Sequence, residues 1–109
     1  MGWTGMMRRI VGLIALALCL ADAQAQSPGV QRGRQFARAN CARCHSIDKV
    51  TPSPLKIAPP FRVLHTRYPI ESIAEALAEG ISTGHPSMPE FRLEPDQIND
   101  LISFMRTLQ

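Results

Sequence analysis

Aromatic residues, cysteines and long apolar runs are all scarce in this chain. Phe, Trp and Tyr make up 6% of its 109 residues, and there are only three cysteines. No apolar stretch reaches the roughly 18 residues that a membrane-spanning helix needs, so we expect no stable membrane insertion. No dense Lys/Arg run is interleaved with aromatics, which argues against nucleic-acid binding. The polar–apolar alternation of a half-buried β-strand is also missing.

The length and composition indicate one small folded domain. A chain of 109 residues fits a single domain and is too short for a two-domain enzyme with a buried cleft. Hydrophobic residues make up 45% and charged residues 19%, which excludes a wholly disordered chain.

Residues 1–25 have the pattern of a cleavable export signal. Arg8 and Arg9 precede an apolar run of 12 residues, 10–21, and Ala23-Gln24-Ala25 supplies the small-x-small cleavage pattern. The apolar run is too short to serve as an uncleaved anchor. We expect cleavage after Ala25 and a periplasmic mature domain of residues 26–109.

The mature domain would keep two of the three cysteines. Cys19 leaves with the signal, and Leu18 before it is not the small residue that lipidation requires. The remaining 84 residues can bury only a modest core. A domain of this size usually needs a disulfide, a metal or a large cofactor for stability. The role of Cys41 and Cys44 therefore indicates which of these three stabilises the domain.

The segment Cys41-Ala42-Arg43-Cys44-His45 is the C-x-x-C-H attachment signature of c-type haem. Two thiols three positions apart can form thioethers with the two vinyl groups of one porphyrin. The next residue, His45, is then held beneath the iron as the proximal ligand.

Three other interpretations of the two cysteines are weaker. A disulfide between Cys41 and Cys44 would close a very short loop and stabilise little. A thioredoxin-like pair needs a strand before it, and none is predicted there. A zinc site needs a second ligand pair at suitable spacing, and no other cysteine survives cleavage.

A haem iron with one histidine can take a sixth ligand. The candidates after cleavage are Met88, Met105, His65 and His85. Met88 is favoured because Pro86 and Pro89 flank it in a stiff, non-helical segment. His85, in the same segment, is its main competitor. Met105 lies in a helical apolar stripe, where methionine usually fills a core.

Three helices are predicted, over residues 30–40, 70–79 and 95–108, each with apolar residues at spacings of three and four. Pro69 suits the first position of the second helix, and Gly80 suits its C-terminal cap. Gly33 is expected to permit a close crossing with the last helix near Leu101 and Phe104. Residues 46–60, with four prolines, are predicted to form a loop.

In the order of these features the chain resembles the class I c-type cytochromes, the small monohaem kind. The resemblance covers residues 33–108, from Gly33 through the Cys41–His45 motif and Pro59 to the Met88-Pro89 segment and the last helix. It implies an all-α fold of three or more short helices around one covalently attached haem c and its iron.

The resemblance also implies roles for residues around the haem. Pro59, with Pro60 as the neighbouring alternative, matches the residue whose carbonyl accepts a hydrogen bond from the proximal histidine. Arg62, Arg67 and Tyr68 lie where the family often places groups near the haem propionates. Ordinary surface charge and a packed tyrosine explain them equally well.

We therefore expect a periplasmic one-electron carrier that is not an enzyme. It would work as a monomer between a redox-protein donor and an acceptor, and a basic rim of Arg43, Lys49, Lys56 and Arg62 could steer it to acidic partners. A fixed haem subunit of a dehydrogenase or oxidase is one alternative. A ligand-binding haem sensor is another, and it would need an open iron site.

Overall fold

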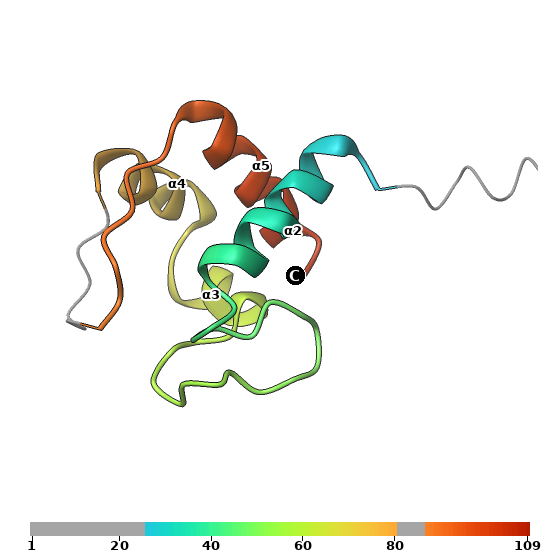
Figure 1. The fold of residues 1–109 in the computed structure, drawn as a ribbon, viewed down its shortest axis with the longest axis vertical. Helices are drawn as coiled ribbons and strands as arrows, with labels where there is room; N and C mark the ends of the chain where they lie inside the picture. Colours follow the sequence, from blue (N-terminus) through green and yellow to red (C-terminus); the bar gives the residue numbers. More distant parts are fainter. Residues whose placement is uncertain (1–25, 81–86) are drawn as a thin grey trace, which may run out of the picture.

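The computed structural model describes residues 26–80 and 87–109, which contain four helices and no strand (Figure 1). The helices are α2 (Pro28–Asn40), α3 (Phe61–Arg67), α4 (Ile70–Glu79) and α5 (Pro95–Arg106). The predicted all-α class is confirmed for this part of the chain. The predicted export signal and His85 lie outside the described residues.

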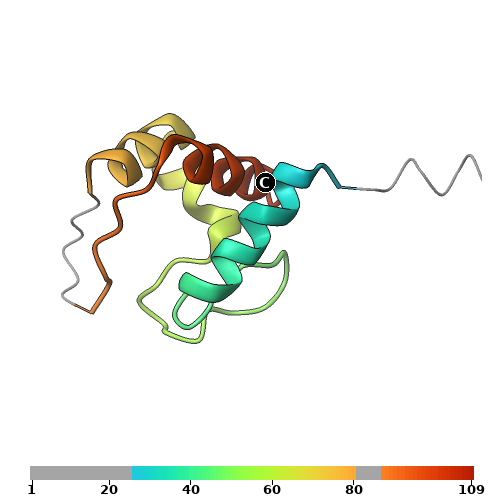
Figure 2. The ribbon, with the colours of Figure 1, turned by 45° about the horizontal axis from the view of Figure 1, so that its top comes forward.

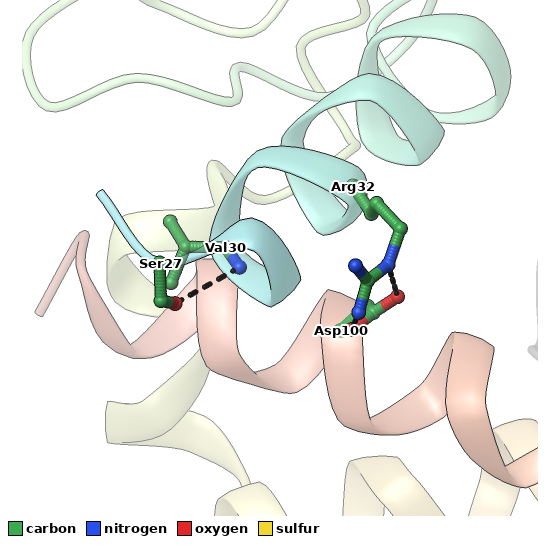
Figure 3. A network of polar contacts seen from close by, with 4 residues as sticks. All are labelled: Ser27, Val30, Arg32 and Asp100. Carbon is green, nitrogen blue, oxygen red and sulfur yellow. Dashed lines mark hydrogen bonds and ion pairs between the residues drawn. The ribbon is translucent and has the colours of Figure 1, made fainter. Parts of the chain in front are cut away.

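Helix α2 begins two residues earlier than predicted, because Ser27 and Pro28 form a start signal. Pro28 occupies the first turn, where its missing N–H costs nothing. The Ser27 hydroxyl accepts a hydrogen bond from the Val30 amide at 3.4 Å (Figure 3). This bond satisfies one of the free donors at the helix start.

Helices α2 and α5 cross at Gly33, as predicted. A Cβ atom at this buried glycine would overlap the backbone carbonyl oxygen of Asp100 and lie 2.9 Å from the Phe104 Cβ atom. Phe104 is 1% exposed. Beside the crossing, the Arg32 guanidinium donates to both Asp100 carboxylate oxygens, at 2.6 and 2.9 Å (Figure 3). The missing side chain of Gly33 thus sets how closely the helices approach.

Helix α4 packs on α5 and has the predicted bounds (Figure 2). Pro69 precedes the first helical residue as the N-cap, so the expectation that it occupies the first helical position is corrected. Gly80 ends the helix with φ of 104°, a conformation that favours glycine. Arg106 of α5 lies 3.6 Å from the Glu71 carboxylate at the start of α4.

The short helix α3 was not predicted. Its seven residues give too few turns for a periodic pattern, but Pro60 before it and Pro69 after it delimit a helix-compatible segment. Phe61, at its start, is 7% exposed and joins the core that α2, α4 and α5 form. Residues 46–60 form the predicted irregular loop. Of the helices described, none has the length and apolar character to cross a membrane.

Candidate functional site

A cavity of about 510 Å³ opens between the helices, and its lining is mostly apolar. Residues of α2, α3, α4 and α5 all contribute to it. Four of the predicted haem-contacting residues line it together: Cys41, Cys44, His45 and Met88. Residues from the 46–60 loop, among them Leu55 and Ile57, complete one side. Segments far apart in the sequence are therefore brought to one concave, apolar site of the size that cofactors use.

The two cysteines lie in the turn that follows α2. Cys41 caps the helix, and its carbonyl accepts hydrogen bonds from the amides of Cys44 at 3.1 Å and His45 at 2.9 Å. Both thiols are free and half-buried. Burial raises the pKa of Cys41 to about 11, so this thiol is neutral near pH 7. A neutral, buried thiol is poorly suited to thiol–disulfide exchange, which weighs against a redox dithiol.

The His45 ring is oriented by the backbone on one side and by an aromatic ring on the other. Its Nδ1 lies 2.7 Å from the Pro59 carbonyl oxygen, which identifies Pro59 and not Pro60 as the contact. Because a carbonyl can only accept, Nδ1 carries the proton and Nε2 keeps its lone pair. The Phe61 ring lies 5.5 Å away, centroid to centroid. This tautomer is the one that a metal ligand needs.

Met88 is half-buried and lines the cavity from the segment between α4 and α5. Two bonds tie this segment to the end of α4: the Leu93 amide donates to the Leu77 carbonyl at 2.8 Å, and the Arg92 guanidinium donates to the Glu79 carbonyl at 3.0 Å. The other predicted candidates lie differently. Met105 is 3% exposed in the core and also borders the cavity, whereas His65 is exposed on α3.

Of the three residues that the resemblance placed near the propionates, two line the cavity and one does not. Tyr68 and Arg67 line the cavity at the end of α3, and Tyr68 is 57% exposed. Arg62 does not belong to the lining. Its guanidinium is directed to the 46–51 segment, where it donates to the Thr51 carbonyl at 2.8 Å. The sequence gives no signal for this contact, since it depends on how an irregular loop folds back.

The residues around the cavity fit a covalently attached haem. The Cys41–His45 turn supplies two free thiols and an imidazole with an available Nε2 atom. Met88 supplies a thioether sulfur on the same cavity. These are the donor types that haem iron takes in cytochromes c. The apolar lining suits the porphyrin faces.

Comparison with known proteins agrees with this chemistry. Residues 30–109 match the family model described as Cytochrome c. The chain is 30% identical to a cytochrome c-553-like protein of Synechocystis sp., over 112 aligned residues that cover 94% of this chain and all of the relative. No solved structure matches it. The chain therefore belongs to the cytochrome c family as a class I c-type cytochrome, whose cofactor is covalently attached haem c with its iron.

Proposed function

We propose that this protein is a diffusible periplasmic electron carrier in which Cys41 and Cys44 attach one haem and His45 and Met88 ligate its iron. The observation that supports this best is the single cavity that all four side chains line. The haem iron supplies storage of one electron, by cycling between the ferric and ferrous states. The polypeptide has to hold the ligands and exclude water.

Cys41 and Cys44 would hold the haem through simple addition. On a bound haem each thiol S–H would add across a vinyl group, with sulfur on one vinyl carbon and the proton on the other. No external oxidant or reductant is consumed. The turn that follows α2 holds Cys41 and Cys44 on the same cavity, which favours attachment along one porphyrin edge.

The proposed ligand set favours electron transfer over catalysis. His45 and Met88 together would hold the iron from both sides and leave no position for oxygen or a substrate, so we propose that the protein is not an enzyme. A thioether ligand raises the reduction potential relative to a second histidine, because the soft sulfur favours ferrous iron. The Pro59 carbonyl, which fixes the His45 ring, acts on the potential in the opposite direction by making the imidazole more basic.

The partners we propose are redox proteins with acidic docking surfaces, met by a monomer in the periplasm after removal of residues 1–25. Arg43, Lys49 and Lys56 are exposed and free to face such a partner. Arg62, the fourth residue of the predicted rim, is instead engaged by three loop acceptors. The proposed basic rim is therefore reduced to the first three residues.

The decisive experiment is absorption spectroscopy of the exported protein, purified from a host that attaches haem c. We expect one haem per chain, two thioethers in the alkaline pyridine adduct, and the weak red band of sulfur–iron ligation in the ferric form. A colourless mature protein would refute the proposal. Carbon monoxide binding by the ferrous protein at neutral pH would favour a sensor, and co-purification with a large dehydrogenase or oxidase would favour a fixed subunit.

A further inference from the structure

The loop that follows the C-x-x-C-H motif is held by one arginine. The Nη1 atom of Arg62 lies within hydrogen-bonding distance of three oxygens of residues 46–51: the Thr51 carbonyl at 2.8 Å, the Ser46 hydroxyl at 3.2 Å and the Asp48 carbonyl at 3.3 Å. The charge of the guanidinium strengthens such bonds. Arg62 therefore ties an irregular segment to the rigid first turn of α3.

Ser46, the residue directly after His45, is the one of these three partners that is buried. It is 4% exposed, and each of its polar groups has a partner. Its amide donates to the Ser53 hydroxyl at 3.0 Å, and its carbonyl accepts from the Phe61 amide at 2.9 Å. Its hydroxyl contacts both Arg62 and the Thr51 hydroxyl. A buried residue with every polar group paired has little freedom to move.

The contacts form a series between two stretches of chain, residues 45–51 and 59–62. His45 bonds Pro59, Ser46 bonds Phe61, and the loop carbonyls bond Arg62. The His45–Pro59 bond can keep its 2.7 Å length only while the two stretches stay in register. The hydrogen bonds of Arg62 are the last of the series and hold the two stretches together at that end.

We propose that Arg62 is a positioning residue for His45, acting through Ser46 to hold the imidazole against the Pro59 carbonyl. The inference rests on the proposed function, since it assumes that His45 ligates the iron. Its role is distinct from a propionate contact, because Arg62 faces the loop and not the cavity. Loss of the arginine should loosen the His45–Pro59 bond.

The test is hydrogen exchange of the His45 Nδ1–H proton, followed by NMR in the ferrous, haem-loaded protein. Arg62→Lys keeps the charge, but its ammonium nitrogen lies one bond nearer the backbone than the Arg62 Nη1 atom, so it falls short of the three loop oxygens. We expect it to speed exchange at His45 Nδ1 and at the Phe61 amide by about tenfold, the effect of losing charge-assisted hydrogen bonds. The reduction potential should rise, because a more weakly held imidazole is less basic. If Arg62→Ala does not acquire haem, the lysine variant carries the test.

Arg32→Ala is the control, since it removes an arginine whose two charged hydrogen bonds go to Asp100 at the α2–α5 crossing and not to the loop. It should speed exchange of the Phe104 amide on α5 without the selective effect at His45. Equal acceleration at His45 and Phe104 in Arg62→Lys, or none at either, would overturn the inference. Neither result affects the proposed function, which fails instead if the haem-loaded protein shows no ligated His45.

Discussion

The Met88 sulfur, as the proposed sixth ligand, is the residue-scale feature with the largest expected effect on the haem. Met88→Ala should open the sixth coordination position, lower the reduction potential and allow carbon monoxide to bind, because the soft thioether that stabilises ferrous iron is removed. Redox titration and carbon monoxide difference spectra measure these effects.

Met105→Leu is the matched control for Met88→Ala. Met105 also borders the cavity, but it is buried in the core. A volume-conserving exchange there should cost less than about 1.5 kcal/mol of stability and leave the potential nearly unchanged. If the potential and ligand binding respond to Met105→Leu and not to Met88→Ala, the assignment of Met88 as the ligand is wrong.

Asp48 couples the stability of the loop to pH. Its carboxylate accepts hydrogen bonds from the Val50 amide at 2.8 Å, the Thr51 amide at 2.7 Å and the Thr51 hydroxyl at 2.5 Å. The hydrogen bonds from Thr51, then that from Val50, lower the pKa of Asp48 from 3.8 to about 2. Because the folded pKa is the lower one, this stabilisation is complete above the unfolded value and is lost as pH falls from about 5 towards 2.

Asp48→Asn should therefore flatten the acid limb of the stability curve. Denaturant unfolding of the haem-loaded protein at a series of pH values measures the effect. The difference in unfolding free energy between wild type and variant should shrink as pH falls through this window. A difference that stays constant from pH 6 to pH 2 would show that the carboxylate charge contributes nothing to folding.

Among the helices, the α2–α5 crossing depends most on one small residue. Gly33→Ala should destabilise the protein by about 1–3 kcal/mol, because the added Cβ meets the Asp100 backbone and cannot be accommodated without moving a helix. Gly29→Ala, four residues earlier in α2, is the matched control. Its Cβ would lie 3.0 Å from the Asp100 Oδ1 atom, a side-chain atom that has to give way by only a few tenths of an ångström, and it would not meet the backbone.

Both glycines lie on α2, but the added methyl group would contact backbone atoms at Gly33 and a side-chain atom at Gly29. Gly29→Ala should stay within about 1 kcal/mol of wild type, since alanine's better helix propensity offsets the mild crowding. Chemical denaturation of both variants with haem attached tests this. Equal stability of the two would mean that the helices can separate at the crossing without cost.

How much the sequence predicts differs between elements for physical reasons. Helix α4 and the start of α5 were predicted correctly because apolar periodicity and proline signals agree there. Gly33 was predicted at the crossing because a glycine inside a helix costs stability relative to alanine, and a close helix approach is a reason to keep it. Helix α3 was missed because seven residues carry too little periodicity.

In the candidate site too, local features were predictable and contacts across an irregular loop were not. The motif residues follow from local spacing, and the Pro59 contact with His45 follows from the family resemblance. The contacts of Arg62 could not be predicted, because they join residues 11 to 16 positions apart across a loop with no periodic pattern. The residues that carry the chemistry of a site are therefore easier to predict from sequence than the hydrogen bonds that hold those residues in place.

Over the whole molecule, charge is distributed unevenly along the chain. Residues 26–67 carry eight basic side chains and one acidic one, a net charge of +7, whereas residues 68–109 carry two basic and seven acidic ones, a net charge of −5. Both ribbon views place the 46–60 loop at the opposite end of the molecule from α4 (Figures 1 and 2). The loop end therefore carries Lys49 and Lys56 away from the acidic residues of α4, whereas the basic residues of α2 lie beside α5, where Arg32 pairs with Asp100.

Exposed charges of one sign at one end of a protein orient it as it approaches a charged partner. An acidic redox partner should attract the end that carries the loop, and exposed Leu55 and Ile57 line the cavity on that side. Lys56→Gln should therefore slow second-order electron transfer to an acidic partner at low ionic strength, by roughly twofold to fivefold, and the deficit should vanish in high salt. Arg106→Gln changes the net charge equally on α5, within the acidic part of the chain. Stopped-flow rates for both variants across ionic strength distinguish an effect of orientation from an effect of net charge. Equal slowing by the two variants would mean that only the total charge matters. A transfer rate that does not depend on salt would rule out electrostatic steering.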